Sequence, residues 1–226
     1  MTSRPLRADA QRNRARLLDV AVHVFAHDGA EAPLEMIAQQ AGVGIGTLYR
    51  HFPTREALIE AAYRNELARL CEAATDVLVT SRPEVALREW MARFLAYMTT
   101  KRGMADALRA VIASGGNPYE QSRLRLLEAI GVLVRAGVAT GTIRADVKPI
   151  DILAGLSGVS LAAADPLQGE RLLDLLLDGL RYGACPIDRC VRTQRTDRLT
   201  KHVAEGGTHR PRLLGPNVAK VQISAK

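Results

Sequence analysis

The chain has 226 residues and a formal net charge of +7, and 47% of its residues are hydrophobic although only 4% are aromatic. This length allows one large or two small domains with a substantial buried core, and the many Ala and Leu residues favour helices. The three cysteines, Cys71, Cys185 and Cys190, include no C-x-x-C pair, and their odd number gives no disulfide framework. Free thiols in a reducing cytosol are the simplest interpretation.

The positive charge is concentrated near the end of the chain. Residues 185–226 hold nine basic and three acidic residues, whereas residues 57–184 hold fifteen of each. Near the other end, five arginines precede the first apolar run: Arg4, Arg7, Arg12, Arg14 and Arg16. A basic arm and a basic tail both suit a polyanion, although a solvated tail explains the second cluster equally well.

The first quarter of the chain predicts one longer helix and two short ones. Apolar residues recur at helical spacing over residues 9–27, and Gly29 suits the left-handed residue that follows a helix. Short helices are then expected over 34–41 and 45–52, on either side of a glycine-containing turn. Thr54 is expected to cap the long helix that follows, over 55–78.

Helical patterns continue to about residue 183, and no strand pattern of useful length occurs. Further helices are expected over 84–98, 103–113, 119–140, 149–164 and 169–183. Residues 185–226 have little apolar periodicity and are expected to be disordered. The longest apolar run, Ile152 to Ala164, is too short to span a bilayer, and the N-terminus lacks an apolar signal core. We therefore expect an all-α, soluble, cytoplasmic protein.

The two short helices have the form of a helix-turn-helix, in which the second helix enters the major groove of DNA. Gly42 suits a residue with positive φ, Val43 faces inward, and Gly46 lets the helix backbone approach the duplex. Thr47 and Tyr49 offer hydroxyl groups to a phosphate or a base edge. Residue types alone leave DNA binding and ordinary helical packing about equally favoured.

Residues 12–63 resemble the N-terminal domain of the TetR family of bacterial regulators. The resemblance rests first on the pattern Arg12-x3-Arg16-Leu17-Leu18-x2-Ala21-x3-Phe25-x3-Gly29. It continues with Ile37-Ala38-x2-Ala41-Gly42-Val43-Gly44-Ile45-Gly46-Thr47-Leu48-Tyr49-Arg50-His51-Phe52-Pro53-Thr54-Arg55-Glu56-Ala57-Leu58. It implies a three-helix DNA-binding head, a larger helical body that binds a ligand and dimerises, and double-stranded operator DNA as partner.

The family correspondence also implies which residues contact DNA. These are Ile45, Gly46, Thr47, Tyr49, His51 and Arg55, with Arg50 as an addition. Three positions depart from the commonest family pattern. Leu34, after Pro33, replaces a Thr, Gly44 replaces a Ser, and Arg55 replaces a Lys. The first two departures remove hydroxyls that commonly touch phosphates, whereas the third keeps the charge.

The body is expected to hold an apolar cavity for a small organic molecule, although ordinary core packing explains any single residue better. The candidate lining residues are Trp90, Phe94, Met98, Met104, Leu108, Ile112, Tyr119, Leu127 and Ile130. The helices within residues 151–183 are so apolar that one chain alone would expose part of their surface. The family dimerises through its last two helices, so both arguments predict a homodimer through this segment.

The resulting domain organisation is a DNA-binding domain over 9–55, a ligand-binding and dimerisation domain over 56–184, and a basic tail over 185–226. The histidines show no metal-ligand spacing with cysteines or acids, and no nucleophile or phosphate-binding motif occurs. We therefore expect no enzyme, no metal and no cofactor. The preferred function is a ligand-released repressor; the alternative is a non-inducible or activating regulator of the same fold. A membrane-surface role for the tail is disfavoured, because the tail has no amphipathic stripe.

Overall fold

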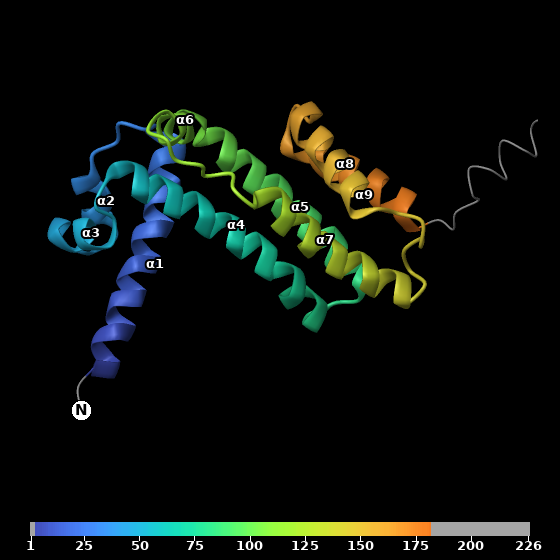
Figure 1. Cartoon of the computed structure of the whole chain (residues 1–226). Coiled ribbons are helices and arrows are strands. Elements are labelled where there is room, and N and C mark those ends of the chain that lie inside the picture. Colours follow the sequence, from blue (N-terminus) through green and yellow to red (C-terminus); the bar gives the residue numbers. More distant parts are fainter. Residues whose placement is uncertain (1–2, 182–226) are drawn as a thin grey trace, which may run out of the picture. The chain divides into compact units, whose positions relative to one another are not determined.

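The described part of the chain, residues 3–181 of a computed structural model, consists of nine α-helices without strands (Figure 1). The helices are α1 (Ser3–His27), α2 (Leu34–Gln40), α3 (Ile45–His51), α4 (Arg55–Thr80), α5 (Pro83–Gly103), α6 (Ala105–Ala113), α7 (Ser122–Ala139), α8 (Pro149–Ala162) and α9 (Pro166–Arg181). The all-α prediction is confirmed. The expected tail, residues 185–226, lies outside the described residues.

Helix α1 has an apolar half and an exposed half. Its buried residues begin at Leu17 and include Leu18, Ala21 and Phe25, which pack in the core of the head. The helix begins at Ser3 rather than at the expected Asp9. The sequence did not reveal these extra turns, because residues 3–8 carry no apolar residues at helical spacing. In Figure 1, this half of α1 extends past α2 and α3.

Helix α4 joins the head to the body. It packs against α1 on one side and against α5, α6 and α7 on the others. Its first turn is capped as expected, because the Thr54 hydroxyl oxygen accepts a hydrogen bond from the Ala57 N–H at 3.1 Å. Its buried residues, from Leu58 to Val77, belong to the same continuous core as those of the head. Residues 1–184 form one compact unit, so the division into domains at residue 55 stays a functional prediction.

The cap at Thr54 gives a direct test of this description. We expect Thr54→Ala to lower the free energy of unfolding by about 1 kcal/mol, because the Ala57 N–H loses its acceptor. Urea denaturation measures the difference. The matched control is Thr75→Ala, whose hydroxyl donates to the Glu72 carbonyl within α4; its effect should stay within about 0.5 kcal/mol. Equal losses in the two variants would contradict a specific role for the cap.

Several helix boundaries of the body differ from expectation, and two of these differences have a clear structural reason. Helix α5 continues to Gly103, where the chain passes close to α1. A Cβ atom at Gly103 would lie 2.8 Å from the Ala26 carbonyl oxygen, so a glycine permits this approach. Helix α7 begins at Ser122 instead of Tyr119, because Gln121 adopts φ 61° and interrupts the helical backbone.

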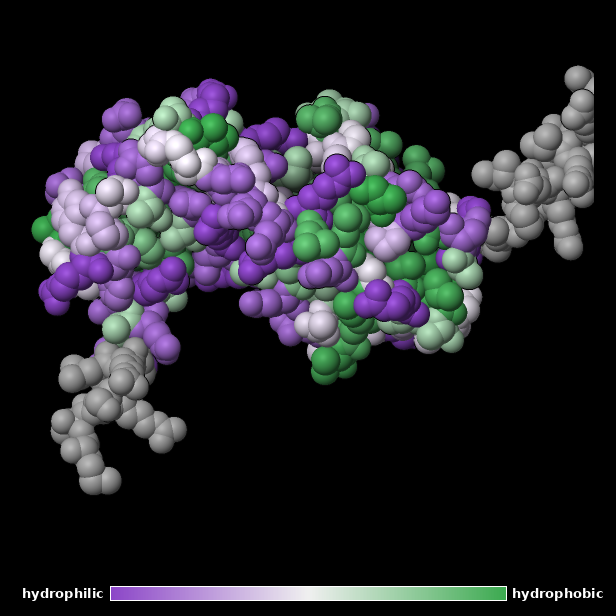
Figure 2. All heavy atoms as spheres, viewed as in Figure 1, coloured by the Kyte–Doolittle hydropathy of each residue, from purple (hydrophilic) through white to green (hydrophobic). Residues whose placement is uncertain are grey.

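Helices α8 and α9 pack against each other and against α5. One face of α9 is buried through Gly169, Leu173, Leu177 and Leu180. Three leucines of this helix pair are nevertheless largely exposed: Leu161 (76%), Leu167 (73%) and Leu175 (68%). Figure 2 shows hydrophobic residues gathered more densely over the part of the molecule that holds α7–α9 than over the hydrophilic region of α1–α3. We call these three leucines the apolar face of α8 and α9.

Within residues 3–181, no helix combines the length and the apolar character needed to cross a membrane.

Candidate DNA-binding surface and ligand cavity

Helices α2 and α3 form the predicted helix-turn-helix. The Val43 N–H donates to the Ala38 carbonyl at 3.0 Å, which closes the turn after α2. Gly42 has φ 66°, the left-handed conformation for which a glycine was expected. Leu48 is fully buried and holds α3 against the head. This combination fixes which face of α3 points away from the core.

The outward face of α3 presents the side chains that the sequence selected. Ile45 is 37% exposed and Tyr49 is 46% exposed, although large apolar and aromatic side chains are usually covered. Thr47 is half-buried and Gly46 is exposed between them. A hydroxyl pair flanked by an apolar side chain suits both phosphate contacts and the methyl group of thymine.

Two basic side chains follow on α3. Arg50 is exposed, and its Nε donates to the Gly46 carbonyl at 3.1 Å, which folds the side chain back along its own helix. His51 is half-buried, with its ring centroid 6.1 Å from that of Phe52. Phe52 is buried, and the Arg14 guanidinium of α1 lies 5.4 Å from its ring centroid. The C-terminal end of α3 is thereby tied to α1.

Both short helices begin without a side-chain cap. Pro33 precedes α2 and Gly44 precedes α3, and neither accepts a hydrogen bond through a side chain. Leu34, where a hydroxyl residue is usual, is buried in the core of the head. These positions therefore offer no hydroxyl group to DNA. More of the contacts with DNA would have to come from α3.

Arg55, which the resemblance implies as a DNA contact, also bonds to the backbone of the head. Its Nη1 donates to the Ala30 carbonyl at 2.8 Å and to the Ala32 carbonyl at 2.5 Å. The guanidinium thus bridges the first turn of α4 and the loop that leads into α2. Sequence reasoning missed this role, because the two acceptors are backbone atoms more than twenty residues away.

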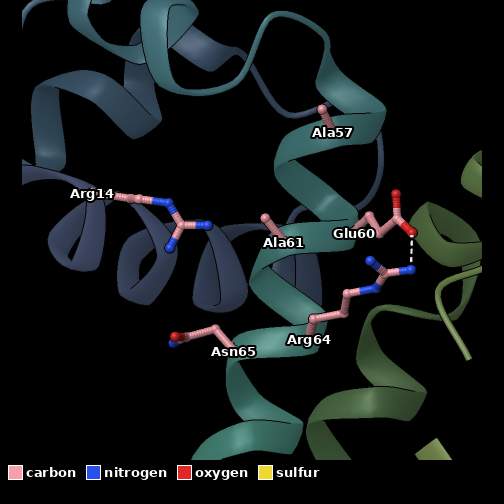
Figure 3. Close-up of a pocket in the computed structure, with 6 residues that line it drawn as sticks. All are labelled: Arg14, Ala57, Glu60, Ala61, Arg64 and Asn65. Carbon is pink, nitrogen blue, oxygen red and sulfur yellow. Dashed lines mark ion pairs between the residues drawn. The ribbon is translucent and has the colours of Figure 1, made fainter. Parts of the chain in front are cut away.

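A shallow hollow of about 380 Å³ lies between α1 and α4 (Figure 3). Arg14 reaches into it from α1, while α4 contributes Ala61, Arg64 and Asn65 among others. The Arg64 guanidinium lies 2.7 Å from a Glu60 carboxylate oxygen, so its charge is already neutralised. Arg64 also donates to the Asn117 carbonyl at 3.2 Å. This contact links α4 to the turn between α6 and α7.

A second space, about 240 Å³, lies in the helical body, opens to the surface beside Tyr119 and Arg123, which are both exposed, and is called the body cavity below. Its lining comes from α4, α5, α7, α8 and the turn before α7: Tyr63, Phe94, Tyr97, Met98, Lys101, Tyr119, Ser122, Arg123, Leu126, Leu153 and Ser157. The Tyr63 and Tyr97 hydroxyl oxygens lie 2.7 Å apart. The rings of Tyr63 and Tyr119 meet edge to face, with centroids 5.5 Å apart.

The chemistry of the body cavity is that of neutral hydroxyls beside cations. Burial raises the pKa of Tyr97 well above its usual range, and the adjacent Tyr63 hydroxyl raises it further. Burial also raises the pKa of Tyr119. Both phenols therefore stay protonated at neutral pH and can donate hydrogen bonds. The Lys101 ammonium lies 4.6 Å from the centre of the Tyr119 ring, within cation–π distance.

Of the nine residues predicted from the sequence to line a ligand cavity, three line the body cavity: Phe94, Met98 and Tyr119. Trp90 is instead fully buried, and its Nε1 donates to the Leu70 carbonyl at 2.8 Å, so it joins α5 to α4. Met104, Leu108 and Ile130 are buried core residues, and Leu127 packs against the core from a partly exposed position. Ile112 was expected to face inward but is 47% exposed.

The missed residues of the body cavity are mainly polar. Helical spacing did not single out Tyr63, Lys101 or Ser122 as lining residues. The one signal available in the sequence was an aromatic residue one helical turn from a cation. That spacing alone does not show whether the two side chains line a cavity, which depends on the tertiary structure. Among residues 3–181, no group of three or more His, Cys, Asp or Glu side chains is placed to hold a metal ion.

The comparisons with known proteins agree with this geometry. A crystal structure of a TetR transcriptional regulator from Streptomyces coelicolor is 55% identical, with a TM-score of 0.72 over 76% of this chain and 99% of that one. A TetR regulator structure from Mycobacterium vanbaalenii is 36% identical, with a TM-score of 0.67 over 79% of this chain and all of that one. The chain belongs to the TetR family.

Two family models match separate parts of this TetR-family chain. Residues 17–62 match the model of bacterial regulatory proteins of the tetR family. Residues 82–182 match the model of the SbtR-like transcriptional regulator C-terminal domain. The expectation of a transcriptional regulator rather than an enzyme is confirmed, because TetR-family proteins are DNA-binding regulators.

The curated relatives match only a short segment of this TetR-family protein. An HTH-type transcriptional regulator of Staphylococcus aureus is 36% identical over 63 residues, which are 27% of this chain. The match spans about a third of that regulator's length, 34%.

Proposed function

We propose that this TetR-family protein is a ligand-released repressor that binds a palindromic operator as a homodimer. The observation that carries the proposal is the outward face of α3, where Ile45 and Tyr49 are exposed although Leu48 anchors the same helix in the core. A rigidly held helix with an unpaired apolar and hydroxyl-bearing face is suited to the major groove.

The proposed DNA contacts are the residues of this face and its basic end: Ile45, Gly46, Thr47, Tyr49, Arg50 and His51. Arg55 is proposed to act differently. Its bonds to Ala30 and Ala32 fix the angle between α4 and the loop before α2. It is thus a positioning residue for the head, and any phosphate contact would use its remaining N–H groups.

The homodimer is proposed to form through residues 151–183. Its support is the apolar face of α8 and α9, where three leucines are each more than two-thirds exposed. Exposed leucines on adjacent helices are costly in water, and a two-fold mate that brings the same face would cover them. Two heads related by this axis would reach two half-sites.

Ligand release is proposed to run through α4. Tyr63 lines the body cavity, and it is two turns along α4 from Arg55, which holds the head. Arg64 ties the same part of α4 to the turn that carries Tyr119. A ligand that displaces these side chains would bias the angle of α4 and therefore the separation of the two heads.

Footprinting of the purified protein on the DNA flanking its own gene tests this function. We expect protection with two-fold symmetry and half-site centres about 34 Å apart, or a multiple of that distance. The matched control is DNA in which one half-site has been scrambled, which should lose most of the protection on both sides. Protection that lacks two-fold symmetry would contradict the proposed dimeric repressor.

A further inference from the structure

The body cavity has an unbalanced set of charges. Its lining includes the cations Lys101 and Arg123 and no carboxylate. Within residues 3–181, neither cation forms an ion pair. Arg123 also borders an adjoining hollow of about 290 Å³, lined further by Ile150, Leu153, Ala154 and Ser157. A positive potential without a local counter-ion favours an anionic occupant.

A buried donor in the same lining is left without a partner. Ser122 is only 8% exposed, and its hydroxyl oxygen makes no hydrogen bond in the described part of the chain. A buried hydroxyl without a partner is unfavourable, and here it lies beside an open cavity. An acceptor atom of a ligand would satisfy it.

The tyrosine pair supplies one further donor. Only one of the two hydroxyl protons can lie between the Tyr63 and Tyr97 oxygens, which are 2.7 Å apart. Neither hydroxyl has another hydrogen-bond partner among residues 3–181. The second proton is therefore free for an acceptor in the cavity. The lining as a whole offers donors and cations, which is the complement of a carboxylate.

The size and the walls of the body cavity restrict the part of the ligand that does not carry the acceptor atoms. Its volume of about 240 Å³ lies below the range of about 300–1,000 Å³ typical of drug-sized ligands. The body cavity by itself therefore suits a compact ligand. Phe94, Tyr97 and Tyr119 supply aromatic walls, which favour a flat, unsaturated body that can stack.

We propose that the body cavity binds a small planar organic anion, namely an aromatic or conjugated carboxylate. The carboxylate lies toward Lys101, Arg123 and Ser122, and the planar body lies against the aromatic side chains of the lining. This inference rests on the proposed ligand response, because it names the chemical class of the ligand. A cationic ligand is disfavoured, because Lys101 already occupies the face of Tyr119.

Calorimetry on the full-length protein with four probes tests the ligand class. The probes are trans-cinnamate, its neutral amide, its cationic counterpart cinnamylamine, and the aliphatic anion hexanoate. We expect cinnamate to bind at least about tenfold more tightly than the amide and the amine, because only the carboxylate meets two unpaired cations. It should also bind more tightly than hexanoate. Equal or tighter binding by the amide, the amine or hexanoate would overturn the proposal, as would the failure of all four to bind at millimolar concentration.

Variants of the lining residues distinguish an effect on ligand binding from an effect on folding. Lys101→Met should remove most of the preference for cinnamate over its amide, whereas the control Lys148→Met, at an exposed lysine before α8, should keep it. Ser122→Ala should weaken cinnamate binding about fivefold, the effect of one hydrogen bond. The same change should leave the melting temperature of the ligand-free protein unchanged or higher, because it removes an unpartnered hydroxyl. An unaltered preference in Lys101→Met would refute the assigned carboxylate position.

Operator binding with and without saturating cinnamate distinguishes the two proposals. Cinnamate that binds selectively but leaves operator affinity unchanged would contradict ligand release and keep the ligand class. Release of the operator by cinnamylamine or the amide, but not by cinnamate, would contradict the ligand class and keep ligand release.

Discussion

A chain carrying both Leu161→Glu and Leu175→Glu should be a folded monomer whose operator affinity has fallen by about 100-fold or more. Both leucines are exposed in the single chain, at 76% and 68%, so the substitutions should change the stability of the fold little. Two carboxylates on each copy would face two more across a two-fold axis, where like charges repel. Loss of the dimer removes the effective concentration that couples two half-sites, which is worth about 10²–10⁴ in affinity.

Light scattering after gel filtration measures the mass, and a mobility-shift titration measures operator affinity. The matched control is Val79→Glu with Leu124→Glu, at two exposed apolar residues on α4 and α7 (85% and 58% exposed). This control should remain dimeric and bind DNA normally. A Leu161→Glu/Leu175→Glu chain that stays dimeric would show that the partner covers another surface.

A Thr47→Ala/Tyr49→Ala chain should bind its operator about 100-fold more weakly and bind unrelated DNA almost unchanged. Each lost base or backbone contact at a specific site typically costs about 1–3 kcal/mol, and two such losses on one helix account for this factor. Non-specific binding rests on basic side chains, which the variant retains. The fold should persist, because neither residue belongs to the buried core and Leu48 still anchors α3.

The measurement is a titration of operator and scrambled DNA at two salt concentrations. Thr75→Ala, at an exposed position on α4, is the control for a lost hydroxyl elsewhere and should bind the operator as the unmodified chain does. An operator affinity that survives in the double variant would mean that α3 is not the recognition helix, and the proposed contacts would then have to be sought on another element of the head.

Helix α4 connects the body cavity to the head. Tyr63 and Arg64 are consecutive residues of α4; one lines the cavity and the other holds the turn that carries Tyr119. Arg55, at the start of the same helix, bonds to the loop before α2. Because a helix transmits a tilt along its length, a change at Tyr63 is proposed to reach α2 through Arg55 without altering the recognition helix itself.

The sequence by itself determined the helical class and the place of the helix-turn-helix. The bounds of α2 and α3, the positive φ of Gly42 and the cap at Thr54 all agree with expectation. These features depend on interactions within a few residues, so short-range spacing and residue type are sufficient to specify them. The start of α1 was not predicted, because the sequence before Asp9 has no apolar residues at helical spacing.

Only the tertiary structure decided what the apolar and basic residues of the body contact. Trp90 and Phe94 are one turn apart on α5, yet Trp90 bonds to Leu70 within the core whereas Phe94 borders the body cavity. Arg55 likewise finds backbone acceptors more than twenty residues away. Periodicity separates an inward face from an outward one, but a filled core and a cavity wall use the same inward side chains. Which of the two a residue joins depends on the packing of distant helices.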